Sequence, residues 1–256
     1  MNKQHHYYTN NMIGEVVPME QRVADRRPQE SSREFVYRFL KSSIMDFSLP
    51  PGASLSEKDI AALLGVSRTP VREAFIQLSQ ESLLDIMPQK GTYVSLIDLD
   101  SVAESKFLRE TMEEAVMKEA CRDYPSAMLF ELQSNVMLQE LCLNEKNYIR
   151  FFELDEALHR SIFEGCRKGR IWHMMQLMHG HYNRVRRLNI AGGYDVQTVL
   201  RQHQEIVQAI SEKNPVRGVE IINSHLNKVN VDINDLLHDY SHYFRLPEKA
   251  DKGITN

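Results

Sequence analysis

The sequence has little of what marks a secreted, membrane-bound or disulfide-stabilised protein. It contains three cysteines in 256 residues, and no two of them form a Cys-x-x-Cys pair. An odd, scattered set predicts reduced thiols rather than a disulfide framework. No apolar run is long enough to cross a bilayer, and the first residues lack the apolar segment of a secretion signal. We therefore expect a cytoplasmic protein.

An excess of positive charge is also missing. Lysine and arginine number 31 against 35 aspartates and glutamates, for a formal net charge of −4. This argues against wholesale coating of nucleic acid, because non-specific affinity rises with the number of phosphates neutralised. A sequence-specific DNA reader remains allowed, since it needs positive charge on one face only. With 42% hydrophobic and 26% charged residues, the chain resembles globular proteins and is long enough for two domains.

What is present in the first part of the chain is a pattern of three short helices followed by two strands. Helical spacing of apolar residues predicts helices over 31–45 and 57–64, the second one capped by Ser56 and ended by Gly65. Ser67 or Thr69 is expected to cap a third helix, with Pro70 in its first turn. Segments 84–87 and 92–95 then form a β-hairpin around a turn. This order predicts a winged helix-turn-helix over residues 29–96, preceded by a flexible arm over residues 1–28.

Candidate DNA-reading residues lie on the second and third helices and at the hairpin tip. The outer face of the third helix carries Arg68, Thr69 and Arg72, and the two arginines are neighbours because they are four residues apart. Arginine can bind a guanine edge through two hydrogen bonds or hold a phosphate. Lys58 and Lys90 supply further cations. The alternative is a winged helix that makes protein contacts only.

The second part of the chain reads as helical throughout. We expect six helices, over 98–122, 125–143, 147–166, 169–190, 195–212 and 215–243, because breaks at proline and glycine separate apolar stripes of helical period. The fold class is therefore mainly α: the winged helix-turn-helix is followed by an all-α antiparallel bundle over residues 97–245. Residues 246–256 are expected to form a tail.

Four polar residues interrupt the apolar stripes of this bundle: Asp155, His159, His203 and His225. An unpaired polar group in a core is costly, and one metal ion would satisfy all four. Three imidazoles and a carboxylate suit a divalent transition metal: zinc, nickel, cobalt or manganese, with zinc expected in purified protein. The alternative is a set of core histidines that are each hydrogen-bonded separately.

Arg109 also lies on a buried stripe and could neutralise a carboxylate bound at the metal. The alternative for Arg109 is a buried ion pair with Glu113. Five further histidines lack such convergence and are expected at the surface or behind the ligands: His173, His179, His181, His238 and His242.

Two segments resemble known families. The run LGVSRTPVREA, within LPPGASLSEKDIAALLGVSRTPVREAFIQLSQESLLDIMPQKGTYV, resembles the DNA-binding domain of GntR-family regulators. The segments FLRETMEEAVMKEA, ELDEALHRSIFEG, RQHQEIVQAI and NSHLNKV are similar to the FCD effector domain of the FadR subgroup. The resemblance implies DNA contacts at Lys58, Arg68, Arg72, Lys90 and Gly91 with Thr69 in support, metal ligands at Asp155, His159, His203 and His225, and an effector contact at Arg109.

The function expected from these residues is that of a homodimeric, ligand-responsive transcription regulator that binds operator DNA and acts as a repressor. Its effector site would hold a metal and a small organic acid. Dimerisation is expected because two recognition helices read two symmetric half-sites. A metal-sensing regulator is one alternative. A metalloenzyme is a weaker one, because no His-Glu-x-x-His general base accompanies the ligands, so we expect no enzyme.

Overall fold

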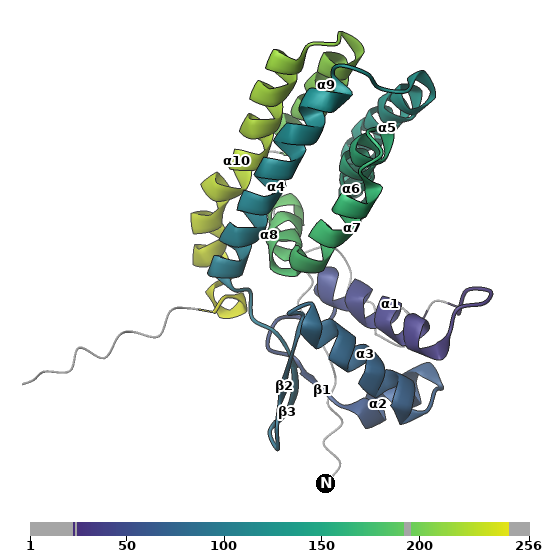
Figure 1. The fold of residues 1–256 in the computed structure, drawn as a ribbon. Coiled ribbons are helices and arrows are strands. Elements are labelled where there is room, and N and C mark those ends of the chain that lie inside the picture. Colours follow the sequence, from purple (N-terminus) through teal and green to yellow (C-terminus); the bar gives the residue numbers. More distant parts are fainter. Residues whose placement is uncertain (1–22, 24, 192–195, 246–256) are drawn as a thin grey trace, which may run out of the picture.

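Three helices and a small sheet make up the N-terminal part of the structure (Figure 1). The structure is a computed structural model that describes residue 23 and residues 25–191 and 196–245. In chain order the N-terminal elements are α1 (Ser32–Met45), β1 (Ser54–Leu55), α2 (Glu57–Leu64), α3 (Arg68–Gln80), β2 (Leu84–Met87) and β3 (Gly91–Val94). This order confirms the predicted winged helix-turn-helix.

Local capping chemistry explains where the first helices begin and end. The Ser31 side chain accepts from the Glu34 amide while the Glu34 side chain accepts from the Ser31 amide, which forms a complete capping box for α1. Ser56 caps α2 in the predicted way. Gly65 ends α2 with a φ of 63°, a left-handed conformation that glycine adopts without steric cost.

The sheet has three strands rather than the two that the sequence pattern predicts. The strand order is β1-β3-β2 and both pairings are antiparallel. Leu84 pairs with Val94 and Met87 with Gly91, whereas β1 contributes only the pairs Ser54–Tyr93 and Leu55–Thr92. A two-residue strand leaves no alternation in the sequence, so only its distant partner reveals it.

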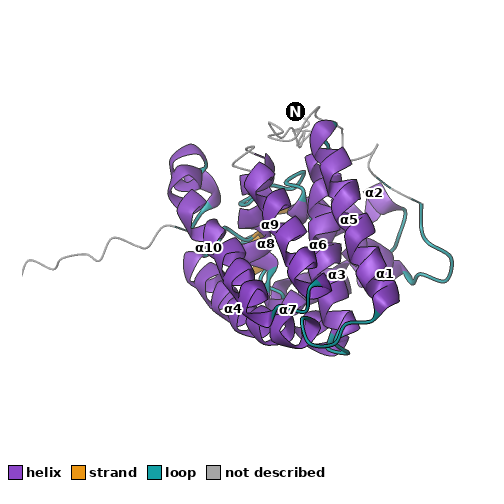
Figure 2. Cartoon of the chain, turned by 90° about the horizontal axis from the view of Figure 1, so that it is seen from above, coloured by secondary structure: helices purple, strands orange, loops and turns teal. Residues whose placement is uncertain are grey.

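The remainder is a helical bundle, drawn above the winged helix in Figure 1 and seen from above in Figure 2. Its elements are α4 (Leu99–Ala120), α5 (Ser126–Asn144), α6 (Tyr148–Gly165), α7 (Gly169–Met178), α8 (Gly180–Ala191), α9 (Val196–Ser211), α10 (Pro215–Asp239) and the short 3₁₀ helix η2 (Ser241–Tyr243). Helix α10 packs along α4 and α9, and α5 packs between α6 and α9. The mainly α fold class is confirmed.

The predicted helix over 169–190 is wrong, because the chain breaks at His179 into α7 and α8. The break lies where the bundle meets the winged helix. A Cβ atom on Gly180 would lie 2.9 Å from a Leu83 methyl carbon and 3.2 Å from the Glu81 carbonyl oxygen. This close approach between two parts of the chain is a tertiary constraint that helical periodicity does not record. The predicted last helix is also too long, since α10 ends at Asp239.

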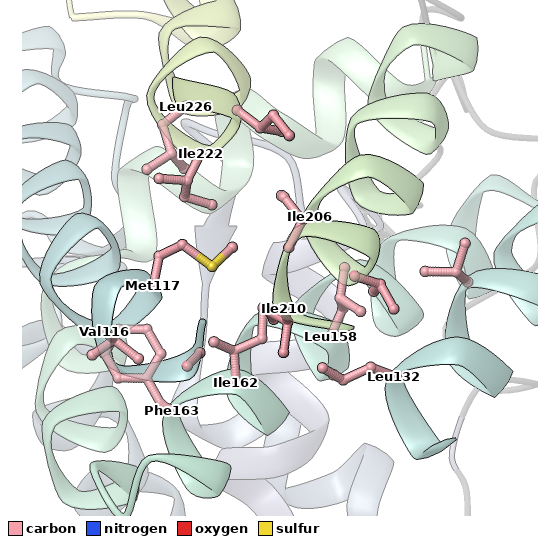
Figure 3. Close-up of a cluster of buried hydrophobic side chains, with 14 of the residues drawn as sticks. Val116, Met117, Leu132, Leu158, Ile162, Phe163, Ile206, Ile210, Ile222 and Leu226 are labelled. Atoms are coloured by element: carbon pink, nitrogen blue, oxygen red, sulfur yellow. The ribbon is translucent and has the colours of Figure 1, made fainter. Parts of the chain in front are cut away.

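Three buried apolar clusters hold the structure together. One fills the winged helix from Phe35 to Val94. A second fills the bundle, where Met117, Ile162, Ile206 and Ile222 point toward one another in Figure 3. The third joins the two parts and contains Phe47, Ile97, Val102, Tyr182, Val185, Leu188, Leu236, Tyr243 and Phe244. The winged helix is thus packed on the bundle, not merely tethered to it.

The cysteine and membrane predictions can be compared with the described residues. Cys121, Cys142 and Cys166 are free thiols. Among the described helices, none combines the length and apolar character needed to cross a membrane. The predicted break at Gly192-Gly193, nearly all of the predicted arm and the predicted tail over 246–256 lie outside the described residues.

Candidate metal centre and DNA-reading face

The fold brings the four predicted metal ligands to one point inside the bundle. Asp155 and His159 are one turn apart on α6, His203 comes from α9 and His225 from α10. All four are buried, and one ligand atom from each lies within 4.8 Å of the others. Each residue sits on the apolar stripe that its helix turns inward, which is why helical spacing alone could bring them together.

The three histidines meet through the same ring atom. The Nε2 atom of His225 lies 3.2 Å from Nε2 of His159 and 3.4 Å from Nε2 of His203. The Oδ1 atom of Asp155 lies 3.2 Å from Nε2 of His203 and 4.0 Å from Nε2 of His159. Three nitrogens and one carboxylate oxygen therefore surround a common centre.

The opposite ring nitrogen, Nδ1, of each histidine faces an oxygen acceptor. The pairs are His159 with Oε2 of Glu113 at 2.6 Å, His203 with Oε1 of Gln139 at 2.7 Å, and His225 with Oε1 of Gln202 at 3.1 Å. The amide groups of the two glutamines donate elsewhere, Gln139 to Asn135 and Gln202 to Ser224, which leaves their oxygens free to accept. With the proton of each ring on Nδ1, facing its acceptor, each Nε2 atom carries a lone pair.

This proton arrangement fits a bound cation. A neutral ring has one proton, so His203 cannot donate to Gln139 and to Asp155 at once. Burial lowers the pKa of His203, and it lowers the pKa of His225 well below its usual value, so neither ring readily takes a second proton. Three converging lone pairs and a carboxylate repel one another until a cation lies between them. Outer acceptors of this kind also orient histidines in known metal sites.

The Asp155 carboxylate is itself held from outside. Its Oδ2 atom accepts from Arg186 of α8, which also binds Glu156. Burial alone would raise the pKa of Asp155, but the charge of Arg186 holds it well below its usual range. Asp155 is therefore ionised, as a metal-ligating carboxylate must be.

Arg109 forms the ion pair that was one of its two predicted alternatives. It is almost fully buried and donates through Nε to Glu113 at 2.5 Å, so the predicted ion pair is present. A second carboxylate, that of Glu156, lies 3.9 Å from Nη1. The Nη2 atom is buried and has no hydrogen-bond partner among the described residues. One donor of Arg109 therefore remains available beside the four converging ligands.

His179, Tyr182 and Arg186 also lie in this region, although the sequence pattern did not identify them as site residues. His179 was predicted at the surface or behind the ligands, but its ring is fully buried, and neither ring nitrogen has a partner within the part of the chain that the structure describes. The Tyr182 hydroxyl is also buried and has no partner in residues 25–191 and 196–245, and the rings of His179 and Tyr182 lie 5.8 Å apart. Tyr182 lies under the guanidiniums of Arg109 and Arg186, at 5.6 and 5.8 Å. The available signal was the run His-Tyr-Asn-Arg-Val-Arg-Arg, whose cations have no acidic neighbours on their own helix.

The predicted DNA-reading residues are all exposed: Lys58, Arg68, Thr69, Arg72, Lys90 and Gly91. Within the described residues, the side chains of Lys58, Arg68 and Lys90 form no ion pair. Arg72 differs, because it binds both oxygens of Glu57 at 3.0 Å. Ser67 precedes α3 without a side-chain cap, so the first amide groups of α3 remain free to bind an anion such as phosphate.

Known proteins resemble this chain over both parts. The family "Bacterial regulatory proteins, gntR family" matches residues 32–94, and the "FCD domain" matches residues 106–228. A helix-turn-helix transcriptional regulator in an unstable DNA locus of Streptomyces ambofaciens is 35% identical over 206 residues, or 79% of this chain and 85% of that protein. The helix-turn-helix transcriptional repressor RspR of Escherichia coli is 28% identical over 217 residues, or 85% and 95% of the two chains.

Solved structures share the fold at lower sequence identity. Escherichia coli McbR/YncC superposes with a TM-score of 0.70 at 18% identity, over 82% of this chain and 99% of that one. A GntR transcriptional regulator from Rhodococcus sp. RHA1 superposes with a TM-score of 0.68 at 23% identity, over 79% and 97%. These two likenesses concern the fold alone.

Proposed function

Because this chain belongs to the GntR family of bacterial helix-turn-helix regulators, in the group with an FCD effector domain, we propose that its DNA binding is controlled by a small carboxylate bound at a metal inside the bundle. DNA-binding transcription regulation is the activity of the family, which is not a family of enzymes. The metal, the effector class and the direction of control are the parts that we add.

The observation that carries the proposal is the convergence of the Nε2 atoms of three buried histidines on the Asp155 carboxylate. The residues that would hold the ion are Asp155, His159, His203 and His225. When bound, the ion would supply open coordination positions to an oxygen ligand. Three nitrogens and one oxygen are compatible with zinc, nickel, cobalt or manganese, and the donor set alone does not choose among them.

The ion pairs around this centre favour an anionic effector. Arg109 and Arg186 form a linked network with Glu113, Asp155 and Glu156, so the carboxylates outnumber the guanidiniums by one. A divalent ion would turn this into an excess of one positive charge. A single carboxylate group would then restore neutrality, which matters because unbalanced charge is costly in a buried site.

Unpaired polar atoms beside the centre indicate the rest of the ligand. Arg109 Nη2 can only donate, whereas the Tyr182 hydroxyl and the His179 ring can donate or accept. Buried polar atoms are normally satisfied, so four such atoms, on three side chains of one region, that lack a partner among the described residues support a ligand that carries hydroxyl or carbonyl oxygens as well as a carboxylate.

On DNA, we propose that the protein acts as a homodimeric repressor in the cytoplasm. The E. coli relative is named as a repressor. Two copies of α3 would read two half-sites of a symmetric operator. The unit that binds DNA is proposed to span residues 29–96, with the effector and dimerisation unit over 97–245. The residues proposed to contact DNA are Lys58, Arg68, Thr69, Arg72, Lys90 and Gly91.

Metal content tests the proposal most directly. Protein purified without chelators or a metal-affinity tag would be analysed by elemental mass spectrometry beside Asp155→Ala and the control Glu153→Ala, an exposed position on the same helix. We expect about one equivalent of a transition metal in the wild type and in the control, and a loss of it in Asp155→Ala. No metal in the wild type, or equal metal in all three, would contradict the proposed centre.

The carboxylate part has a separate test. Small mono- and dicarboxylates would be screened by thermal shift against the zinc-loaded protein and against Arg109→Met. We expect stabilisation by at least one acid in the wild type only. Operator titrations of metal-free and metal-loaded protein, with and without that acid, then separate this mechanism from a metal sensor, in which the ion alone changes DNA affinity.

A further inference from the structure

Helix α8 touches both the candidate metal centre and the winged helix, through residues on opposite faces. Residues four apart share a helix face, so Tyr182 and Arg186 point together toward the Asp155 region. His181 and Arg184, three residues apart, share the opposite face. We infer that His181 and Arg184 are positioning residues that hold the DNA-reading domain in one orientation on the effector domain, and that α8 links this orientation to the metal centre. The inference rests on the proposed function of that centre.

The His181–Arg184 pair, called here the α8 latch, forms hydrogen bonds to Ser95 and Asp98 and, through Ser95, reaches Ser82. Arg184 donates through Nη1 to the Ser95 carbonyl at 2.6 Å and through Nη2 to the Ser95 hydroxyl at 3.1 Å. The Ser95 hydroxyl in turn donates to the carbonyl of Ser82 at 2.6 Å. Ser82 follows α3 and Ser95 follows the wing strand β3. The latch therefore fixes the ends of the two elements that face DNA.

His181 completes the latch by accepting two hydrogen bonds at one atom. Its Nδ1 atom receives the backbone amide of Asp98 at 3.1 Å and Nη2 of Arg184 at 2.9 Å. Asp98 is the N-cap of α4, the helix that leads from the winged helix into the bundle. One ring thus ties the start of α4 to α8.

The contacts of the α8 latch fix an orientation of the winged helix, but they add little stability and can be broken. Arg184 is fully buried, yet its hydrogen-bond partners in the described structure are all neutral, and its Nε atom has no partner there. Burial lowers the pKa of Arg184 to about 9, the direction expected for a cation without a close counter-ion. A buried charge in this state is expensive. A polar pocket of about 420 Å³, lined in part by Ser82, Asp98 and His181, lies beside the latch. Water in this pocket can replace the hydrogen-bond partners of the latch when the domains separate.

The other face of α8 is tied to the centre by ion pairs that a ligand would alter. Arg186 binds Asp155 and Glu156. A cation at Asp155 and an anion near Arg186 would both compete for these partners. Because the two sets of contacts lie within two turns of one helix, a shift that re-forms the Arg186 contacts moves Arg184 relative to Ser95. Such differential contacts are what allows a ligand to change an orientation.

The test compares full-length wild type with Arg184→Met, which removes the charge but keeps much of the bulk. Arg201→Met, an exposed arginine of α9, is the matched control. The probe is zinc alone, added to metal-free protein. Zinc stoichiometry and affinity are measured first, so a failure of the metal centre is seen separately from a failure of the latch. Hydrogen exchange at 83–98 is then compared without and with zinc.

In the wild type and in Arg201→Met, zinc is expected to change exchange at 83–98, although no candidate metal ligand lies there. In Arg184→Met, zinc should bind with unchanged affinity while this change disappears. A second readout uses an operator selected from random duplexes with wild-type protein. The ratio of operator affinities with and without zinc should fall toward 1 in Arg184→Met, with a melting temperature equal to or above that of wild type. Zinc binding without any change at 83–98 in the wild type, or the same change in Arg184→Met, would overturn the inference.

Discussion

Gln139 offers the sharpest test of how the metal centre is held, because it touches His203 but cannot reach the ion itself. Its side chain is fully buried on α5, and its Oε1 atom accepts the Nδ1 proton of His203 at 2.7 Å. Gln139→Leu keeps a similar volume and removes this acceptor. The His203 ring is then free to place its proton on Nε2, where Asp155 Oδ1 lies 3.2 Å away and would accept it. In that tautomer the ring has no lone pair on Nε2, the atom that faces the metal centre.

The expected magnitude follows from this loss of orientation. Removing an outer partner of a metal-bound histidine typically weakens metal affinity by about 10- to 100-fold, or roughly 1.4 to 2.7 kcal/mol. The stability of the metal-free protein should change less, because the new contact between His203 and Asp155 replaces the lost one. The two forms should therefore respond differently, and the difference is the signature of a tautomer-fixing role.

The assay is competition of zinc against a chelator of known affinity, together with urea unfolding of the metal-free protein. Gln133→Leu, at an exposed position on the same helix, controls for the change in helix composition. Equal zinc affinity in Gln139→Leu and wild type would refute the argument that Gln139 fixes the ring. A large loss of stability in the metal-free variant would also count against it, since it would mark Gln139 as a packing residue.

Three further outcomes are expected. Arg72→Ala should weaken binding to a selected operator by about 1–3 kcal/mol, measured by fluorescence anisotropy. Stability should stay nearly constant, because the ion pair of Arg72 with Glu57 is exposed. Unchanged DNA affinity would remove Arg72 from the reading face. Gly180→Ala should lower stability by about 1–3 kcal/mol, since its Cβ would meet Leu83, and an unaltered melting temperature would show that the junction can relax. Burial, followed by the charge of a neighbouring arginine, lowers the pKa of His181 to about 3, so the unfolded ring takes a proton near pH 6.5 that the folded ring refuses. The free energy of unfolding that this group contributes is therefore fully present above pH 6.5, and it should fall by about 1.4 kcal/mol for each pH unit below 6.5. His181→Gln should flatten the pH dependence of the urea midpoint between pH 6.5 and 5.

Local chemistry explains which features could be predicted from the sequence. The ends of α1 and α2 follow from Ser31, Ser56 and Gly65, which act on amide groups within a few residues. Asp155 and His159 could be paired because a helix places residues four apart on one face. Such signals need no knowledge of how one helix sits against another.

The missed features depend on contacts between distant segments. Gln139 and Gln202 look like ordinary helix residues until the packing of α5, α9 and α10 sets them beside histidine rings. The break at His179 reflects the approach of Gly180 to the winged helix. The free donor of Arg109 appears only once its other contacts are known. In each case the deciding quantity is the relative placement of two elements, which periodicity within one element does not encode.

The apolar cluster between the two parts limits how freely this regulator can be recombined. Phe47, two residues after α1, stacks on Tyr243 of η2 with ring centres 5.7 Å apart. Ile97 lies opposite Phe244 in a parallel β-bridge, in which its amide donates to the Tyr243 carbonyl and its carbonyl accepts from the Arg245 amide. A chimera joined in the linker near residue 96 would bring a foreign surface to Tyr243 and Phe244. Exchanging DNA-binding domains to build new biosensors from this scaffold would therefore require the position of Phe47 to be carried along with the effector domain, as if it belonged to that side of the junction.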